Sequence, residues 1–545
     1  MKSNFLKKIT LAACALILTM GSTSCIDDLN QGIKDPQTNT VLDPTGLLAK
    51  VYASLSITGQ VGSDGNPDMS QFDEGNSAFY RRIFEANELC SDECIWTWQG
   101  DAGIPEMTNI SWDSSHGYNE LTYYRMQYNV TLCNYYLQET ADTDDAQVLQ
   151  YRAEVRFMRA LYWYYFIDLY GKAPYKEVVD DTLPVEISRE EAFNKAVSEL
   201  KAITGESGDS REVLLDYAGD NSNYGRADKV AAYMLLARLY LNAEVYTGTA
   251  HWQDAADYAN KAINSPYKIN FTAKNGYTAY QQLFMGDNGE NANARQEIVF
   301  PIRCDGATSR SYGGAIYPIA SPTGSGTPDC GLASSQWTCN RARQALVLKF
   351  FESEDKVPMG KDNIKAVYTA AGDDRAMFFT GGEGNDARTF STEEKTTFVA
   401  GLGILKWSNL YADGGTPKDV TFPDTDIPFF RLAEAYLTRA EANFRLGNKP
   451  YALQDVNYIR SRANAKPLDS LTERDVIDEW CREFYFEGRR RSDLIRFGLF
   501  TSGSYVWDWK GGTYAGNGVN STYNIYPIPF NELNSNPNMH QNVGY

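Results

Sequence analysis

Histidine is scarce in this chain of 545 residues, which contains only His116, His251 and His540, far apart in the sequence. A catalytic triad built on histidine, or a metal site with several histidine ligands, is therefore not favoured. The nine cysteines include no paired CxxC motif, so they predict neither a zinc site nor a disulfide framework. Cys90 and Cys94 are four residues apart and fit either one helical face or a pair of buried thiols.

Basic residues are also in deficit, because 51 lysines and arginines stand against 70 aspartates and glutamates and leave a formal net charge of -19. An acidic surface repels phosphate groups, which excludes nucleic acid and anionic lipid as favoured partners. Aromatic residues are abundant instead, at 13% of the chain, and 43 glycines indicate many loops. Some of these rings must pack helices, and loops are able to present the rest.

The N-terminus carries an export signal. Three lysines precede an apolar run from Ile9 to Met20, which is too short to span a bilayer, so residues 1–24 predict a secretory signal peptide. Cys25 stands where a lipoprotein signal peptidase would cut and leave a thiol to be acylated; ordinary cleavage beside an incidental cysteine is the alternative. The following IDDLN resembles the acidic address of surface-exposed bacterial lipoproteins. We expect an outer-membrane protein that faces the cell exterior and is held only by its lipid anchor.

Helical periodicity dominates the rest of the chain. Apolar repeats predict a buried helix over residues 154–170 and two similar pairs of helices, over 227–241 with 252–263 and over 429–444 with 451–463. Alanines at the expected crossing points are typical of tetratricopeptide-like hairpins. We therefore expect a mainly α fold over residues 25–545, a single domain. Its helical repeats should lie at about 120–264 and 428–500, and its loop-rich regions, with short strands and the ligand site, at about 60–115 and 265–425.

Three motifs resemble those of the SusD/RagB family: RAEVRFMRALYWYYFIDLYGKAPY (152–175), EWCREFYFEGRRRSDLIRFG (479–498) and YPIPFNELNSNPNMHQNVGY (526–545). With the lipoprotein start, the resemblance covers the chain from end to end. It implies a binding protein, not an enzyme, that captures nutrients, mostly glycans. It also implies a partner, a SusC-like TonB-dependent transporter in the outer membrane. The acids around Arg489, Arg490 and Arg491 predict an internal ion-pair cluster rather than a basic patch.

The variable segments 73–81, 92–98, 310–314 and 336–339 are similar to those of the starch-binding member of the family. This likeness implies an α-glucan ligand, such as starch or maltooligosaccharides. Aromatic rings stack on the apolar face of a pyranose, and charged groups bond its hydroxyl rim. By resemblance, Trp96 packs inward, whereas an aromatic arc of Trp98, Tyr312 and Trp337 follows the glucan helix. The hydroxyls would be bound by Asp73, Arg81 and Asp101, and the starch-binding member has asparagine where this chain has Asp101.

A structural calcium ion is a further expectation from the family. Asp424 and Asp426 are two residues apart, and residues 287–293 (DNGENAN) form a second oxygen-rich loop; together they supply the hard oxygen ligands that calcium prefers, although Gly289 of this loop stands where the family has an acid. Two solvated turns are the alternative, and no catalytic cofactor is expected. Other functions stay open: a different glycan or a peptide as cargo, a scaffold whose hairpins grip a partner peptide, or a glycoside hydrolase that uses two of the many carboxylates.

Overall fold

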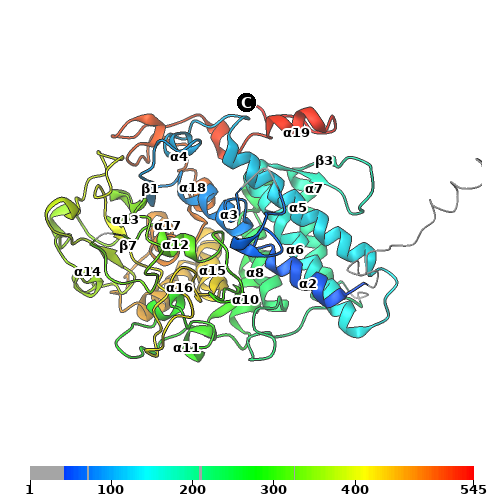
Figure 1. Ribbon diagram of the computed structural model, residues 1–545, viewed down its shortest axis with the longest axis horizontal. Helices are drawn as coiled ribbons and strands as arrows, with labels where there is room; N and C mark the ends of the chain where they lie inside the picture. The colour runs from blue at the N-terminus through cyan, green and yellow to red at the C-terminus, as the bar shows by residue number, and fades with distance from the viewer. Residues whose placement is uncertain (1–41, 70–72, 208–210, 325) are drawn as a thin grey trace, which may run out of the picture. The chain divides into compact units, whose positions relative to one another are not determined.

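The computed structural model describes residues 42–69, 73–207, 211–324 and 326–545 (Figure 1). The signal peptide and Cys25 lie outside these ranges. Residues 45–545 belong to one unit of the chain, and that unit contains everything described below except Pro44, the first residue of α2. Within the described ranges, no helix combines the length and the apolarity that a membrane span requires.

A long buried helix, α6 (Ala146–Tyr170), runs through the unit and confirms the helix expected over residues 154–170. It begins at Asp145, whose carboxylate accepts hydrogen bonds from the first backbone amides, and it ends at Gly171, whose φ of 66° stops the helix. From Ala153 to Tyr170 every residue except Arg156 is buried. A helix that is buried all round needs partners on every face.

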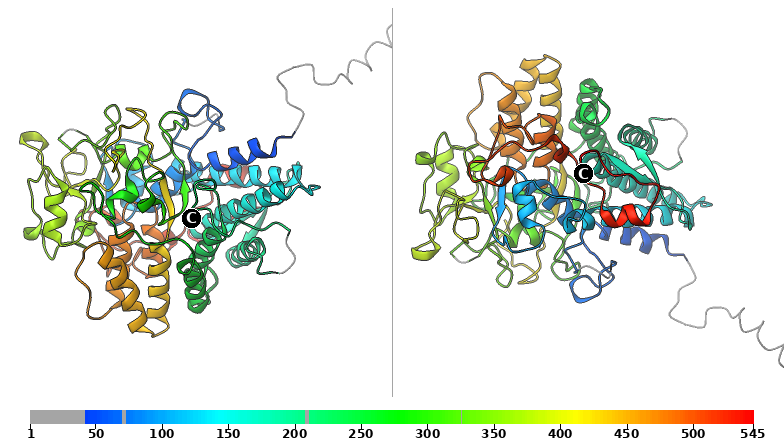
Figure 2. Two further views of the ribbon diagram at one scale, coloured as in Figure 1. Left: turned by 90° about the horizontal axis from the view of Figure 1, so that it is seen from below. Right: turned by 90° about the horizontal axis from the view of Figure 1, so that it is seen from above.

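Those partners are helix pairs. α8 (Lys229–Leu241) packs on α10 (Trp252–Ile263), α10 packs on α15 (Ala433–Arg445), and α15 packs on α16 (Lys449–Arg462), as both views of Figure 2 show. The alanines of α10, Ala255, Ala259 and Ala262, are fully buried and allow the close approach of its neighbours. The expected mainly α fold with tetratricopeptide-like hairpins is confirmed.

The predicted start of one helix was wrong. The helix expected from Phe429 begins only at Ala433, because Ile427–Arg431 forms strand β8, which pairs antiparallel with β4 (Ile298–Ile302). Pro428 lacks the amide proton of a helix interior, and the apolar side chains of this run are buried in the sheet. A short apolar run of this kind fits a helix as well as a strand. Pairing with β4, which is far away in the sequence, makes it a strand here.

Among the residues that the structure describes, the other strands form three antiparallel pairs. They are β1 (Cys94–Trp96) with β5 (Asn340–Ala342), β2 (Lys172–Tyr175) with β3 (Val185–Ser188), and β6 (Phe378–Phe379) with β7 (Gly403–Ile404). Cys90 and Cys94 do not share a helical face, because α3 ends at Glu88 and Cys94 begins β1; both are buried free thiols.

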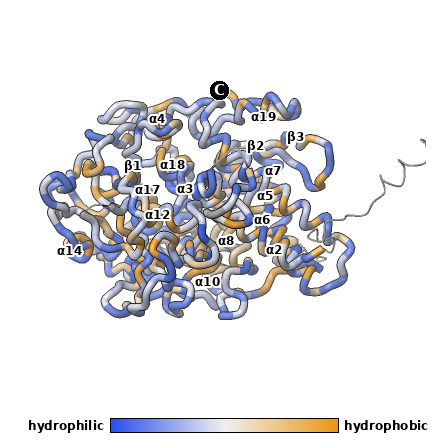
Figure 3. The backbone as a smooth tube through the Cα atoms, viewed as in Figure 1, coloured by the Kyte–Doolittle hydropathy of each residue, from blue (hydrophilic) through white to orange (hydrophobic). Residues whose placement is uncertain are grey.

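The remaining helices cover the core or connect the loops. They are α2 (Pro44–Ala53), α3 (Phe79–Glu88), α4 (Ile104–Asn109), α5 (Gly117–Glu139), α7 (Arg189–Ile203), α9 (Ala243–Thr247), α11 (Ala292–Arg295), α12 (Ile316–Ala320), α13 (Gln344–Val347), α14 (Ile364–Ala371), α17 (Glu473–Phe484), α18 (Arg490–Arg496) and α19 (Phe530–Ser535). Hydrophilic residues are frequent in the loops around α14, whereas hydrophobic ones gather near α8 and α10 (Figure 3).

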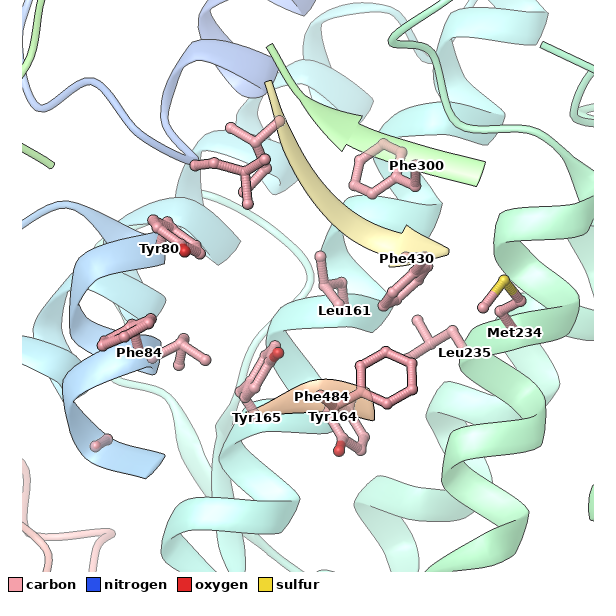
Figure 4. Packing of buried hydrophobic residues seen from close by; sticks show 14 of the residues in the cluster. Tyr80, Phe84, Leu161, Tyr164, Tyr165, Met234, Leu235, Phe300, Phe430 and Phe484 are labelled. Carbon is pink, nitrogen blue, oxygen red and sulfur yellow. The ribbon is translucent and has the colours of Figure 1, made fainter. Parts of the chain in front are cut away.

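Aromatic side chains from distant elements meet in the core. Figure 4 shows Tyr80 and Phe84 of α3 opposite Tyr165 of α6, with Phe300 of β4 and Phe430 of β8 nearby. Such edge-to-face and tilted ring contacts add specific geometry to the burial of apolar area. The core therefore fixes α3, and with it the loops that follow α3, relative to the helical scaffold.

A buried ionic network surrounds α17. Glu483 accepts hydrogen bonds from Arg431 at 2.5 Å and from Arg375 at 3.1 Å, and it also contacts Arg462. Burial alone would raise the pKa of Glu483, but the three arginines lower it to about 2. Glu479 binds the same Arg375 at 2.7 Å. The network joins α16, α17, β8 and the loop before β6.

A second buried ion pair joins the start of β1 to α18. Arg490 donates from Nε and Nη2 to the two oxygens of Asp92, at 2.7 and 2.9 Å. The next residue, Glu93, accepts from the backbone amide of Phe486 at 2.8 Å, and Glu88 accepts from that of Gly488 at 2.6 Å. The expected internal ion-pair cluster is confirmed, and it holds residues 88–93 against the C-terminal motif.

We predict that Arg490→Met lowers the free energy of unfolding by about 3–5 kcal/mol, because the carboxylate of Asp92 stays buried without its partner. Urea unfolding measures the change. Arg211→Met is the matched control, since Arg211 pairs with Asp144 at the surface, where both side chains are exposed, and little stability depends on such a pair. A shared midpoint for wild type and Arg490→Met would contradict the structural role of this ion pair.

Candidate functional site

Two segments run side by side and position three of the six expected site residues, Asp73, Arg81 and Tyr312. Glu74 accepts hydrogen bonds from the Ser311 hydroxyl at 2.6 Å and from the Tyr312 amide at 3.2 Å. Gly75 has a φ of 76°, and a Cβ added there would lie 2.5 Å from the Cβ of Tyr312, so a side chain is excluded at this crossing. Residues 73–81 and 310–317 are thereby held together.

Arg81 and Tyr317 meet where these segments enter α3 and α12. The Arg81 guanidinium lies 4.7 Å from the centre of the Tyr317 ring, and its Nε donates to Glu85 at 2.9 Å. Tyr317 is fully buried and also stacks on Trp96, with ring centres 5.7 Å apart and planes 9° apart. Trp337 contacts the Tyr317 ring at 6.2 Å in an edge arrangement. Arg81 and Trp337 are both half-buried, and both pack against the ring of Tyr317.

The two tryptophans that follow Cys94 have different environments. Trp96 is 4% exposed and Trp98 is 39% exposed, and their rings meet edge to face at 5.7 Å. β1 places Trp96 opposite Asn340, and the amide of Thr97 extends the pairing by donating to Cys339 at 2.6 Å. The chain then turns outward, so Trp96 faces the core and Trp98 faces solvent.

Asp101 lies on the turn that begins at Trp98. Its amide donates to the Trp98 carbonyl at 3.0 Å, and its side chain is exposed. The structure thus brings Trp98, Asp101, Arg81 and Trp337 to one surface around the buried pair of Trp96 and Tyr317.

Tyr312 and Asp73 lie at the other end of the paired segments. Tyr312 is 37% exposed and packs edge to face on Phe422 at 5.1 Å, while Arg310 lies over the same Phe422 ring at 4.9 Å. Asp73 is exposed beside Glu74. We call the six expected residues the aromatic surface: Asp73, Arg81, Trp98, Asp101, Tyr312 and Trp337.

Sequence reasoning missed the residues that support this surface. Tyr317 contacts Arg81, Trp96 and Trp337, yet it lies in a short apolar helix with no motif to distinguish it from core. Phe422, under Tyr312, also lacked a local signal. Exposed aromatic rings are suited to stack on the flat apolar face of a ligand. One guanidinium and two carboxylates are suited to form hydrogen bonds with the polar groups at the rim of that ligand.

Asp424 and Asp426 are buried in the loops near Phe422, at 5% and 3% exposure. Asp424 accepts from the backbone amides of Gly306 at 3.0 Å and Lys418 at 2.9 Å, and from the hydroxyl of Tyr411 at 3.0 Å. These protein donors already satisfy the carboxylate. The alternative of two solvated turns is wrong, because both carboxylates are inside the fold.

The surroundings of Asp426 do not fit a calcium ion. Its Oδ1 accepts from the Cys304 amide at 2.8 Å, and the cation Arg303 lies 4.0 Å from Oδ2. A Cβ at Gly289 would lie 2.4 Å from Oδ2, which leaves no room for an acid there. Burial raises the pKa of Asp426 to about 7. Across the described ranges, no cluster of three or more histidine, cysteine, aspartate or glutamate side chains is arranged to hold a metal ion.

The helical scaffold carries exposed aromatic and charged side chains on its loops, an arrangement that is suited to binding a ligand. The chain is 45% identical to the starch-binding protein SusD of Bacteroides thetaiotaomicron over 100% of both chains. It is 24% identical to the SusD-like protein P25 of Formosa agariphila over 76% of each. The family model described as the SusD family matches residues 296–545.

Solved structures show the same fold at low sequence identity. A SusD-like carbohydrate binding protein from Bacteroides fragilis superimposes with a TM-score of 0.67 at 18% identity, over 91% of this chain and 98% of that one. The surface glycan-binding protein A of Bacteroides thetaiotaomicron, in complex with laminarihexaose, gives a TM-score of 0.64 at 18% identity, over 92% and 98%.

The chain belongs to the SusD family. The family expected from the three sequence motifs is therefore confirmed, and so is its mainly helical fold. It is a binding protein and not an enzyme, as the resemblance implied.

We predict opposite effects for the two neighbouring tryptophans. Trp96→Ala should lower the free energy of unfolding by roughly 3–5 kcal/mol, since it leaves a cavity between Tyr317 and β5. Trp98→Ala should leave the free energy of unfolding almost unchanged, because much of its ring is already in solvent. Urea unfolding of both variants measures the difference. If Trp98→Ala unfolds at a lower urea concentration while Trp96→Ala is as stable as wild type, Trp98 is the core residue and Trp96 the surface residue, contrary to the assignment made here.

Proposed function

We propose that the chain captures starch-type α-glucans at the cell exterior and passes them to a SusC-like TonB-dependent transporter in the outer membrane. The exposed Trp98 ring is the observation that carries this function. Asp101 lies on the same turn, and Trp96 beneath Trp98 stacks on the Tyr317 ring that also contacts Arg81. Trp337 packs on the Tyr317 ring, and Tyr312 lies at the other end of the paired segments. By the family resemblance, the three rings form an arc that matches the curved face of an α-glucan.

Each residue of the aromatic surface has a distinct task in this function. Trp98, Tyr312 and Trp337 stack on glucose rings, with about 0.5–1.5 kcal/mol from each ring contact beyond its buried area. Arg81 donates to neighbouring hydroxyls; its contacts with Tyr317 and Glu85 already hold the guanidinium in place, which reduces the entropy cost of binding. Asp73 and Asp101 are carboxylates that accept hydrogen bonds from hydroxyls.

The names of the relatives support a glycan ligand. The full-length relative is called a starch-binding protein, and similar structures include surface glycan-binding proteins. A different glycan, or a peptide, is the alternative cargo for the same surface.

The lipid anchor at Cys25 and the transporter partner belong to the same proposal. A signal peptide followed at once by cysteine supports acylation, and one acidic segment after it supports export to the cell surface. A structural calcium ion is not part of the proposal, because backbone amides and Tyr411 donate hydrogen bonds to the two candidate carboxylates, and the cations Arg303 and Lys418 lie 4.0 and 3.6 Å from them.

We predict that amylose, amylopectin, pullulan and cyclic α-glucans slow the protein in affinity electrophoresis and that flat β-1,4-glucans do not. Trp98→Ala and Trp337→Ala should each weaken binding to amylose roughly tenfold, about 1.4 kcal/mol, because a stacking ring is lost.

Tyr451→Ala is the matched control, since Tyr451 is a 67% exposed ring on α16 and lies outside the aromatic surface. It should bind like wild type. Equal retardation in gels of cellulose derivatives and of starch would remove the α-glucan assignment. Unchanged binding by both tryptophan variants would contradict the assignment of the aromatic surface as the glycan-binding site.

We predict that Cys25→Ala yields a folded protein that no longer fractionates with outer membranes, because the acyl chains are its membrane attachment. Cell fractionation in a strain without the transporter makes the measurement, with a Cys304→Ala variant as control. Retention of Cys25→Ala with the membranes of that strain would contradict the lipid anchor.

A further inference from the structure

An open hollow of about 360 Å³ lies beside the turn that carries Trp98 and Asp101. Its walls come from the end of that turn, from α4, and from the start of α5 with the loop before it. Ala102 and Gly103, the two residues after Asp101, form part of one wall, so the turn leads directly into the hollow. A hollow of this size is in the range of pockets that bind small ligands.

Tyr118, in the first turn of α5, lines this hollow and is half-buried. The Arg82 guanidinium lies 4.7 Å from the centre of its ring, and the ring of His116 meets it edge to face at 6.0 Å. Within the described ranges, the hydroxyl of Tyr118 has no hydrogen-bond partner. The ring is therefore held in place by its neighbours, while the hydroxyl is left to bind a ligand.

Tyr118 is also close to two residues of the aromatic surface. Burial raises the pKa of the Tyr118 hydroxyl to about 12, and Glu85 raises it as well, whereas Arg82 lowers it. Arg81 lowers the same pKa and Asp101 raises it, so both of these charges act on the hydroxyl. Because electrostatic effects weaken with distance, Arg81 and Asp101 lie near Tyr118. The hydroxyl stays neutral at physiological pH and is able both to donate and to accept.

The other polar side chains of the hollow offer mainly acceptors. Oδ1 of Asp113 accepts from the amide and the hydroxyl of Ser115, at 2.8 and 2.6 Å, and within the described residues its Oδ2 has no partner. Oε2 of Glu106 lacks a partner in the same part of the chain. Acceptors require a ligand that is rich in donors, and the negative charges disfavour an anionic ligand. A neutral sugar, whose hydroxyls donate, meets both conditions.

We propose that this hollow is a further sugar subsite of the aromatic surface, in which the Tyr118 hydroxyl forms a hydrogen bond with the glucose unit next to the one bound at Trp98 and Asp101. The inference rests on the proposed function of that surface. A glucan that extends beyond Asp101 passes Ala102 and enters the hollow, where Tyr118 and Asp113 replace water around its hydroxyls. A short chain that ends at Trp98 does not reach them. The subsite therefore favours longer neutral glucans over short ones.

Tyr118→Phe tests the subsite, because it removes only the hydroxyl and keeps the ring beside Arg82. Isothermal titration calorimetry with the series from maltotriose to maltoheptaose gives the affinity at each chain length. We expect an unchanged unfolding temperature, an unchanged affinity for the shortest oligosaccharide that binds, and an affinity for maltoheptaose about fivefold weaker, as for one lost hydrogen bond. Tyr135→Phe is the matched control, since Tyr135 is a 42% exposed tyrosine of α5 outside the hollow, and it should match wild type at every length.

The dependence on chain length separates the possible outcomes. Equal affinities of wild type and Tyr118→Phe for maltoheptaose would overturn the subsite and leave the proposed function intact. An equal loss at every chain length would also overturn it, because Tyr118 would then act at the same glucose unit as Trp98. A wild-type protein that binds no α-glucan of any length would instead remove the proposed function, and the subsite with it.

Discussion

Asp92 and Arg490 lie 398 residues apart in the sequence, and their buried ion pair decides where β1 runs. Glu88 and Glu93 add bonds to the backbone of the same C-terminal motif. That motif contains Phe486, whose φ of 59° is strained for a bulky residue and whose amide is held by Glu93. Beside it, Glu479 and Glu483 of α17 bind the arginines that join the helical scaffold. Buried ion pairs contribute little net stability, yet each becomes costly once one partner is missing.

The aromatic surface depends on this ion pair and on the bonds of Glu88 and Glu93 beside it. β1 follows Glu93 directly, so the position of Asp92 and Glu93 fixes Trp96, and Trp96 in turn stacks on Tyr317. Arg81 and Trp337 pack against the same Tyr317 ring, and the ring of Trp98 contacts that of Trp96. A rigid, buried frame thus carries a partly exposed row of side chains, and little conformational freedom is lost when a ligand binds.

Much of the scaffold was predictable from sequence, because amphipathic repeats over ten or more residues have few alternatives. Helices α8, α10 and α16 lie within two residues of their expected ranges, and α6 ends where expected but begins eight residues earlier. β8 was missed because five apolar residues fit a strand as well as a helix, and the partner β4 lies more than a hundred residues away. The exposed Trp98 was expected through the family resemblance. Tyr317 and Phe422 were not, because their roles arise from contacts between segments that no local pattern connects.

The central claim is that the aromatic surface holds a glucan. The most direct measurement is a crystal structure of the protein with maltoheptaose. We predict glucose rings stacked on Trp98, Tyr312 and Trp337, with Arg81 and Asp101 within hydrogen-bonding distance of hydroxyls. A maltoheptaose bound elsewhere, for example in the groove of about 620 Å³ between α5 and α19, with these rings left in solvent, would contradict it.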